Sequence, residues 1–146
     1  MKGNNLNLFK KLRDMKILLI DDDEWIRDSL LLFFQGEGCD LVGLATAEDA
    51  MEMLKKQSYD IIISDYRLPG MDGLEFFKLT RESHPHALKI LITAYGSDEL
   101  ASTASSLGID DLILKPLTTN AIEKSLGLLV ERYDRQKVEI PGEKGR

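Results

Sequence analysis

Four apolar segments of the sequence are each followed by, or end in, a polar side chain that suits phosphate chemistry. These side chains are Asp21 and Asp22, Asp65, Thr93 and Lys115. A carboxylate can act as a nucleophile toward phosphorus and form an aspartyl phosphate. Phosphoryl transfer depends on positioning and charge neutralisation more than on acid–base chemistry. The residue types therefore predict a pocket in which one aspartate becomes phosphorylated.

The predicted pocket needs cations because it gathers carboxylates. Two or three carboxylates within ~4–6 Å repel one another and raise their pKa values unless a cation intervenes. Lys115 can balance one of them. A divalent ion can balance the rest, and Mg²⁺ prefers oxygen ligands and keeps some of its waters. No His or Cys stands near these positions, so the sequence predicts magnesium and not zinc.

Each of these residues also has a simpler interpretation. The acidic run 21–23 can cap the helix that follows it. Thr93 can hydrogen-bond locally, as strand hydroxyls usually do. Lys115 can be an ordinary loop lysine before Pro116. The residues occur together at the ends of four apolar segments, which favours a shared phosphorylation site over separate local roles, since independent placement of all of them is improbable.

The elements that must position these groups alternate between strands and helices. Strands are predicted over residues 16–20, 40–45, 59–64, 88–93 and 111–114, and helices over residues 24–35, 46–54, 73–83, 97–107 and 118–133. Thr46 and Ser97 have the character of helix N-caps. This alternation predicts a parallel sheet with helices on both faces. Ligands bind at the carboxyl ends of such strands, so all the polar groups are expected at one edge.

Composition limits the class of protein. A chain of 146 residues with 43% apolar content suits one domain, and a net charge of −6 argues against direct nucleic-acid binding. Cys39 is the single cysteine, no apolar run is long enough to span a membrane, and no signal segment is present, so a cytoplasmic location is expected. We expect an N-terminal extension over residues 1–14, a tail or short helix outside the core. One domain should follow over 15–134, then a mobile C-terminal tail over 135–146.

Four motifs resemble the receiver domain of two-component response regulators. They are Ile17-Leu-Leu-Ile-Asp-Asp-Asp23, Ile62-Ile-Ser-Asp-Tyr-Arg-Leu-Pro-Gly-Met-Asp-Gly73, Ile92-Thr-Ala94 and Leu114-Lys-Pro116. The resemblance covers residues 15 to about 133 and extends to single-domain chemotaxis-type regulators. It implies a flavodoxin-like (β/α)5 fold, a doubly wound five-stranded parallel sheet. The implied strand order is 2-1-3-4-5, for which a receiver protein is itself a standard example.

The resemblance also implies a role for each acidic residue. Asp65 is similar to the aspartate that a histidine kinase or histidine phosphotransfer protein phosphorylates. Asp22 is similar to the direct Mg²⁺ ligand and Asp21 to the carboxylate that acts through water. Asp65 and the backbone carbonyl of Arg67 complete the implied metal set. Asp23 is not expected to be a ligand.

The remaining implied roles concern the response to phosphorylation. Thr93 resembles the switch hydroxyl that moves to the phosphoryl group, and Ala94 leaves room beside it. Lys115 resembles the lysine that pairs with the phosphoryl group, and its bond to Pro116 is expected to be cis. By the same resemblance, the helix 97–107, the strand 111–114 and the helix 118–133 form the output face, which is also a candidate surface for a homodimer.

The sequence departs from the family pattern at several positions. Leu112 stands three residues before Lys115, where many receivers carry Tyr or Phe that swings inward on activation. Leu117 stands where Phe is common. Tyr95 and Arg67 border the predicted phosphoryl site and could limit the access of water. We therefore predict a relatively long-lived phosphoaspartate.

The leading hypothesis is a phosphoacceptor receiver that is not an enzyme and that controls a downstream effector protein, or an output domain on a longer chain. A pseudo-receiver that serves only as an interaction module is an alternative. A less favoured alternative is an aspartate-nucleophile phosphatase, which usually needs a second Asp two residues after the nucleophile, where this chain has Arg67. A nucleotide-binding domain of flavodoxin type is weaker still, because no glycine-rich phosphate loop follows the first strand.

Overall fold

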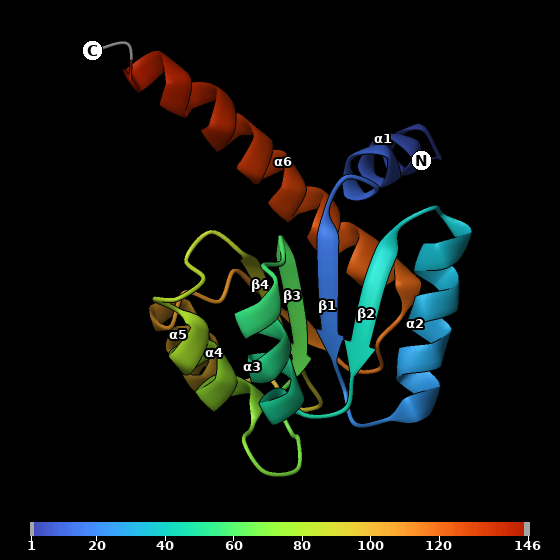
Figure 1. The fold of residues 1–146 in the computed structure, drawn as a ribbon, viewed down its shortest axis with the longest axis vertical. Coiled ribbons are helices and arrows are strands. Elements are labelled where there is room, and N and C mark those ends of the chain that lie inside the picture. Colours follow the sequence, from blue (N-terminus) through green and yellow to red (C-terminus); the bar gives the residue numbers. More distant parts are fainter. Residues whose placement is uncertain (1, 145–146) are drawn as a thin grey trace.

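A five-stranded parallel sheet forms the centre of the molecule (Figure 1). The computed structural model describes the backbone of residues 2–144 and the side chains of residues 7–135. The strands lie in the order β2-β1-β3-β4-β5, which confirms the predicted fold class and topology. Their bounds are β1 Lys16–Ile20, β2 Asp40–Leu44, β3 Ile61–Asp65, β4 Leu88–Thr93 and β5 Asp111–Leu114.

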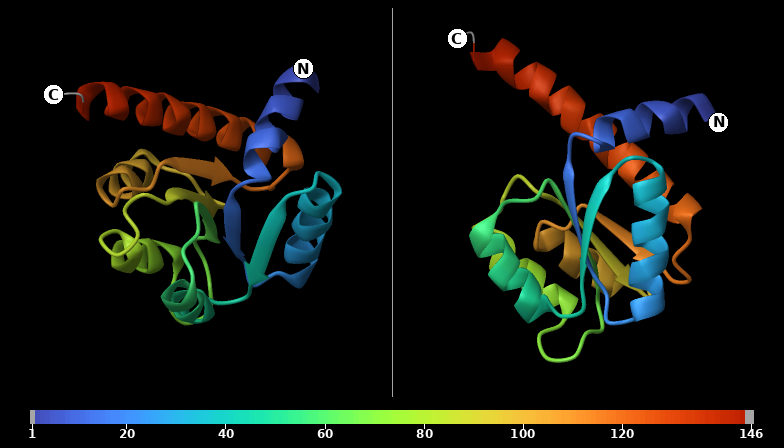
Figure 2. Two further views of the ribbon diagram at one scale, coloured as in Figure 1. Left: turned by 45° about the horizontal axis from the view of Figure 1, so that its top comes forward. Right: turned by 45° about the vertical axis from the view of Figure 1, so that its right-hand side comes forward.

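Helices cover both faces of this sheet (Figure 2). Their bounds are α1 Lys2–Leu12, α2 Glu24–Gly36, α3 Ala47–Lys56, α4 Gly73–Thr80, α5 Asp98–Ser106 and α6 Thr119–Lys144. One apolar core joins α1, α2 and α6 to the sheet, and a second joins α3, α4 and α5 to its other face. No helix among the described residues is both long enough and apolar enough for a membrane crossing.

The central parts of β1, β3 and β4 are mostly apolar because both of their faces are buried. In β1, Ile17 and Leu19 enter the core beneath α1, α2 and α6, whereas Leu18 and Ile20 enter the core beneath α3, α4 and α5. Burial on both faces removes the alternation of apolar and polar residues that a half-exposed strand would show. The parallel registers place the ends of β1, β3, β4 and β5 side by side, so the residues that follow them share one edge.

The predicted helix starts are confirmed by their capping bonds. The hydroxyl of Thr46 accepts a hydrogen bond from the Asp49 N–H, and the hydroxyl of Ser97 accepts one from the Leu100 N–H. The carboxylate of Asp23 accepts hydrogen bonds from the first turn of α2, which explains why this third acidic residue is not part of the predicted metal set. Side-chain acceptors at these positions satisfy N–H groups that have no partner within the helix.

The N-terminal segment differs from its prediction, because α1 is part of the core. Leu8, Phe9 and Leu12 are buried, and the ring of Phe9 packs edge-on against Phe33 and Phe34 at centroid distances of 5.7 and 6.4 Å. The segment forms the short helix that was one of its two expected forms, but the expectation that it lies outside the core is wrong for these three residues. The apolar residues of α1 are few, but they complete a core that α2 and α6 leave open.

The last helix also extends beyond its predicted end at Tyr133. In the structure α6 continues to Lys144, and its C-terminal half projects past the sheet (Figure 1). The residues directly after Tyr133 include Arg135, Gln136 and Lys137, which are good helix formers, so helix propensity favours continuation past the predicted end. Lys11 of α1 forms an ion pair with Asp134 at 2.6 Å, so α1 contacts α6 beyond the predicted helix end.

Phe9→Leu is expected to lower the free energy of unfolding by about 1 kcal/mol, because leucine fills part of the site but loses the edge-to-face contacts with two rings. The measurement is urea unfolding followed by circular dichroism. Leu32→Ala is the control, since Leu32 is 70% exposed and its removal should change stability by less than about 0.5 kcal/mol. Equal effects of both substitutions would contradict a core role for α1.

Candidate functional site

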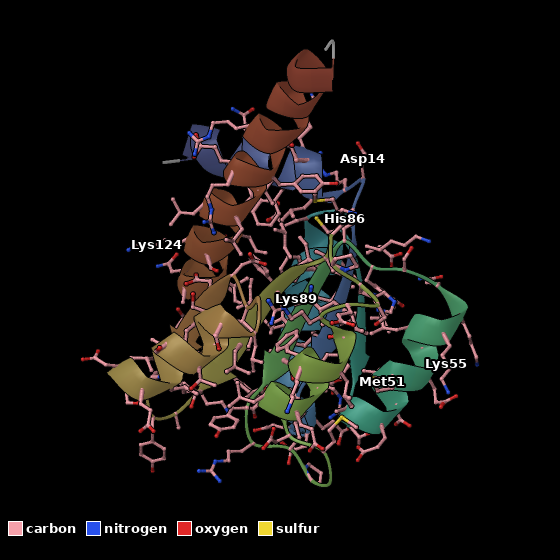
Figure 3. All side chains as sticks on the ribbon, turned by 90° about the vertical axis from the view of Figure 1, so that its left-hand side faces the viewer. Asp14, Met51, Lys55, His86, Lys89 and Lys124 are labelled. Carbon is pink, nitrogen blue, oxygen red and sulfur yellow. The ribbon has the colours of Figure 1, made fainter. Side chains whose placement is uncertain are left out.

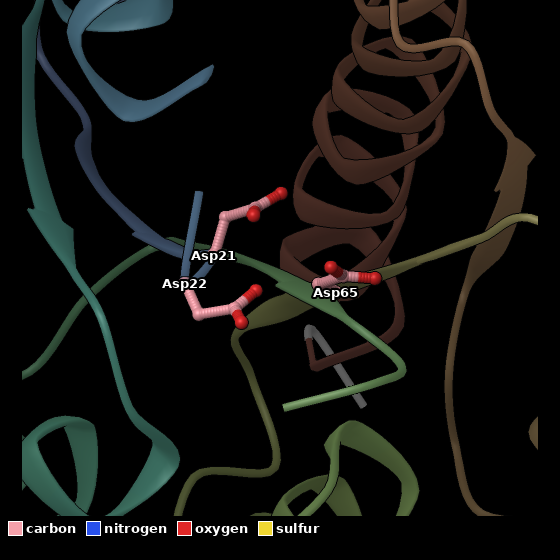
Figure 4. A group of neighbouring side chains, drawn as sticks. All are labelled: Asp21, Asp22 and Asp65. Carbon is pink, nitrogen blue, oxygen red and sulfur yellow. The ribbon is translucent and has the colours of Figure 1, made fainter. Parts of the chain in front are cut away.

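Three carboxylates converge at the carboxyl edge of the sheet (Figure 4). Asp21 and Asp22 follow β1, and Asp65 ends β3, which is the neighbour of β1. One carboxylate oxygen from each residue lies within 4.8 Å of the others. The strand registers therefore bring together the acidic groups that the sequence predicted, although 44 positions separate Asp21 from Asp65.

Asp21 is the most deeply buried of the three carboxylates. Its side chain is fully buried, and Oδ1 accepts a hydrogen bond from the Asp23 N–H at 2.9 Å. The other oxygen, Oδ2, is buried and has no hydrogen-bond partner in the structure. Burial, followed by repulsion from Asp65 and Asp22, raises the pKa of Asp21 to about 6 against the opposing effects of the Asp23 N–H and Lys115. A buried carboxylate oxygen without a partner is costly, so this site favours a cation.

The donor set fits a hard divalent cation. The ligand atoms of Asp21, Asp22 and Asp65 are all oxygens, and Asp22 is exposed so that waters could complete a coordination shell. The unpartnered Oδ2 of Asp21 is the structural observation that supports such an ion. Arg67 lies two residues beyond β3, and its guanidinium packs over the ring of Tyr66 at 5.2 Å. Its backbone carbonyl as a ligand stays a prediction.

Lys115 supplies the positive charge on the other side of Asp65. Its Nζ donates to Oδ2 of Asp65 at 2.9 Å, and Asp65 itself is only 3% exposed. Burial alone would lower the pKa of Lys115, but the hydrogen bond to Asp65 and the nearby carboxylates outweigh burial and raise it. The lysine therefore stays charged beside Asp65. The Lys115–Pro116 peptide bond is cis, as the resemblance implied.

Thr93 is close to this pair but is bonded elsewhere. The backbone N–H of Lys115 donates to the Thr93 carbonyl, which joins the ends of β4 and β5. The buried Thr93 hydroxyl donates to the Tyr95 carbonyl at 3.3 Å and accepts from the Tyr95 N–H at 3.2 Å. The structure therefore shows the local bonding that was the simpler interpretation of Thr93. A role at Asp65 requires this hydroxyl to leave both bonds.

Two residues that the sequence did not single out position the site. The Arg27 guanidinium donates to the backbone carbonyl of Asp21 at 2.8 Å. The carboxylate of Glu48 accepts from the Met71 N–H at 2.8 Å and lies against Gly70, whose φ of +75° favours glycine. These contacts hold the loops after β1 and β3. The sequence carried no signal for them because they join side chains to the backbone of distant segments.

The positions that depart from the family pattern lie beside Thr93. Tyr95 is 82% exposed, and together with Arg67 it borders an open cavity of about 360 Å³. Leu112 is partly buried against the core beneath α3, α4 and α5. Asp65 is not among the residues that line this cavity, and the predicted shielding of Asp65 from water stays a prediction.

Lys89 is the one buried lysine among the described side chains, and it packs in the core away from the carboxylates (Figure 3). Its Nζ donates to the backbone carbonyls of His84 and Ala87, at the end of the sheet opposite the carboxylates. Burial lowers the pKa of Lys89, although nearby Asp110 opposes the shift. The two carbonyls satisfy the ammonium group where α4 leads into β4.

Comparisons with known proteins agree with this geometry. The family model described as the response regulator receiver domain matches residues 17–127. The chain is 35% identical over 107 residues to the response regulator protein FleR of Pseudomonas aeruginosa, covering 73% of this chain and 23% of FleR. It is 30% identical over 123 residues to the transcriptional regulatory protein AfsQ1 of Streptomyces coelicolor, covering 84% of this chain and 54% of AfsQ1. The chain thus spans between about a quarter and about half of these relatives.

Solved structures share the fold. The CheY-like response regulator receiver domain protein of Methanospirillum hungatei superposes with a TM-score of 0.75 at 29% identity, covering 86% of this chain and 98% of that chain. A two-component response regulator from Clostridium difficile gives a TM-score of 0.76 at 24% identity, covering 82% and 98%. With the family match over residues 17–127 and the carboxylates gathered beside a lysine at the sheet edge, this chain belongs to the response regulator receiver domain family.

Proposed function

We propose that this chain is a phosphoacceptor that receives a phosphoryl group on Asp65 from a histidine kinase or a histidine phosphotransfer protein in the presence of Mg²⁺. One observation carries the proposal. The Asp65 carboxylate lies between the Lys115 ammonium, 2.9 Å away, and the two carboxylates of Asp21 and Asp22, one of which has an unpartnered buried oxygen. The pocket therefore combines a nucleophile, the fixed positive charge of Lys115 and carboxylate ligands for a divalent cation.

The transfer step uses groups of this chain. A carboxylate oxygen of Asp65 forms a bond to phosphorus while the bond from phosphorus to the donor's imidazole nitrogen breaks, and the electron pair of that bond stays on the imidazole. Mg²⁺ held by Asp21, Asp22 and Asp65 would neutralise charge on the phosphoryl oxygens. Lys115 can exchange its bond to Asp65 for one to a phosphoryl oxygen. Thr93 can contact a phosphoryl oxygen after leaving the Tyr95 backbone.

The test is the intact mass of the protein after incubation with acetyl phosphate and Mg²⁺. A gain of about 80 Da that disappears when EDTA replaces Mg²⁺ supports the proposal. A folded protein that gains no mass from acetyl phosphate is then offered a phosphorylated histidine phosphotransfer protein. Failure with both donors would reject a phosphoacceptor and favour the pseudo-receiver.

The phosphorylated protein is expected to lose its phosphoryl group slowly, because Tyr95 and Arg67 border the cavity beside Thr93, and a loop movement that brings either side chain over Asp65 would restrict the attacking water. The measurement removes acetyl phosphate by rapid desalting and follows the species with about 80 Da of added mass in Mg²⁺. Tyr95→Ala is expected to shorten its lifetime. Rapid loss in the wild-type protein, unchanged in the variant, would contradict the shielding.

The structure favours the phosphoacceptor over its two rivals. A pseudo-receiver has no need for a buried Asp21 whose oxygen lacks a partner, or for a Lys115 bonded to Asp65. An aspartate-nucleophile phosphatase needs an acid–base carboxylate two residues after the nucleophile. Arg67 holds that position, is exposed and stacks on Tyr66. We therefore propose a protein that is phosphorylated and is not an enzyme acting on small phosphate esters.

We propose that partner proteins bind this chain at two different surfaces. A phosphodonor must approach the carboxyl edge, where Trp25 is 76% exposed on the first turn of α2 beside Asp22. The face formed by α5, β5 and α6 offers Leu114 and Leu128, which are 55% and 56% exposed, to an effector, an output domain on a longer chain or a second copy. We propose a cytoplasmic location for these exchanges.

A further inference from the structure

The loop between β4 and α5 places an aromatic residue at the border of a cavity while most of its side chain stays exposed to solvent. Tyr95 is 82% exposed, which is unusual for a large aromatic residue in a folded domain. Its loop borders the cavity of about 360 Å³ next to Thr93, a volume in the range of pockets that bind small molecules. The cavity is therefore large enough for a phenol ring.

The walls of this cavity suit a tyrosine. Tyr66, Leu74 and Leu100 supply apolar surface and are packed against the core beneath α3, α4 and α5. Glu99 and Thr103 line the same cavity from α5 and offer oxygen atoms to a phenol hydroxyl. A buried aromatic ring with a partner for its hydroxyl is a favourable arrangement for tyrosine.

The Thr93 hydroxyl holds the loop in the exposed conformation. It forms two hydrogen bonds with the backbone of Tyr95, one to the carbonyl and one from the N–H. Both bonds are lost together if the hydroxyl turns to a phosphoryl group on Asp65. The same movement would therefore free the backbone of the residue that carries the exposed ring.

We infer that Tyr95 is the aromatic switch of this chain. Phosphorylation of Asp65 draws the Thr93 hydroxyl away from the loop, and the Tyr95 ring then enters the cavity between Leu74 and Leu100. The inference rests on the proposed function. It assigns to Tyr95 the readout that Leu112 cannot give, because Leu112 has no ring and is already partly packed against the core. The movement changes the surface at the start of α5, where a partner can detect it.

The experiment measures the exposure of Tyr95 before and after phosphorylation. The chain is produced with 3-fluorotyrosine at its four tyrosines, and Tyr95→Leu assigns the fluorine resonance of residue 95. A soluble gadolinium chelate then relaxes exposed fluorines more than buried ones. With acetyl phosphate and Mg²⁺, the relaxation of the Tyr95 fluorine is expected to fall several-fold, while intact mass on the same sample reports phosphorylation.

Four variants test the path of the ring. Thr103→Trp fills the cavity from α5 and should abolish the protection of Tyr95 without preventing the gain in mass. Ala101→Trp places the same bulk at an exposed position of α5 that does not line the cavity, and protection should persist. Thr93→Ala removes both hydrogen bonds and should lower the exposure of Tyr95 before phosphorylation, whereas Thr93→Ser should retain the wild-type exposure.

The mass and the fluorine signal separate the possible failures. A gain in mass with unchanged relaxation at Tyr95 would overturn the switch and leave the proposed function standing. Protection that persists in Thr103→Trp would also overturn it, because the ring would then move somewhere other than the cavity. A protein that gains no mass from either donor would overturn the proposed function and, with it, the switch.

Discussion

Asp65→Asn is expected to abolish the gain of about 80 Da that acetyl phosphate and Mg²⁺ produce in the wild-type protein. An amide has nearly the same shape as a carboxylate but is not a nucleophile toward phosphorus, so the variant should fold and should not react. The change also removes the ion pair with Lys115, while it relieves the repulsion between Asp65 and Asp21. These two effects on stability oppose each other, so loss of phosphorylation should not reflect unfolding.

Asp72→Asn is the matched control. Asp72 lies in the loop after β3 and accepts a hydrogen bond from the Glu75 N–H as the N-cap of α4, a role that asparagine fills equally well. It should therefore retain the full gain in mass. A mass gain that survives in Asp65→Asn, or that maps by peptide analysis to Asp21 or Asp22, would place the acceptor on another carboxylate.

The positions of the site carboxylates could be predicted because the sheet determines them. Asp65 follows an apolar run that only a buried strand explains, and the order β2-β1-β3 then places its tip beside Asp21. The alternation of elements predicts a parallel sheet and the right-handed crossover restricts its topology, whereas the strand order itself was implied by the resemblance to receiver domains. The location of the site therefore depends on where the strands end, and the hydrophobic pattern of the sequence predicts those positions.

Other features could not be predicted because they depend on single side-chain contacts. The few apolar residues of α1 gave a weak pattern, and their burial depends on the rings of Phe33 and Phe34 on another helix. The bonds of the Thr93 hydroxyl depend on the path of the loop at Tyr95, which the sequence does not specify. The lack of a partner for the Asp21 oxygen could not be predicted either, because it depends on the positions of all the nearby donor groups.

Asp21→Asn is expected to abolish the stabilisation of the protein by Mg²⁺ and, in EDTA, to make the protein more stable than wild type near pH 7.5. The folded protein holds a proton on Asp21 up to a pKa of about 6, whereas the unfolded chain releases it near 3.8. Between these values the folded state binds more protons, so wild-type stability falls as the pH rises from about 4 to above 6. A shift of about two pKa units corresponds to about 3 kcal/mol, and the asparagine variant avoids this loss.

Urea unfolding at several pH values, with EDTA or with Mg²⁺, measures both effects. In EDTA the two proteins should have similar stability near pH 4, and the advantage of the variant should grow through pH 6 and then level off. Saturating Mg²⁺ should stabilise only the wild type, by about 2.7 kcal/mol at a hundredfold excess over the dissociation constant. Asp22→Asn separates the two effects. Its loss should also abolish the stabilisation by Mg²⁺, because Asp22 resembles the direct ligand, but it should add little stability in EDTA because Asp22 is exposed. If Asp21→Asn left the pH profile unchanged, Asp21 would not be the source of the pH dependence, and its unpartnered oxygen would not be the group that the cation stabilises.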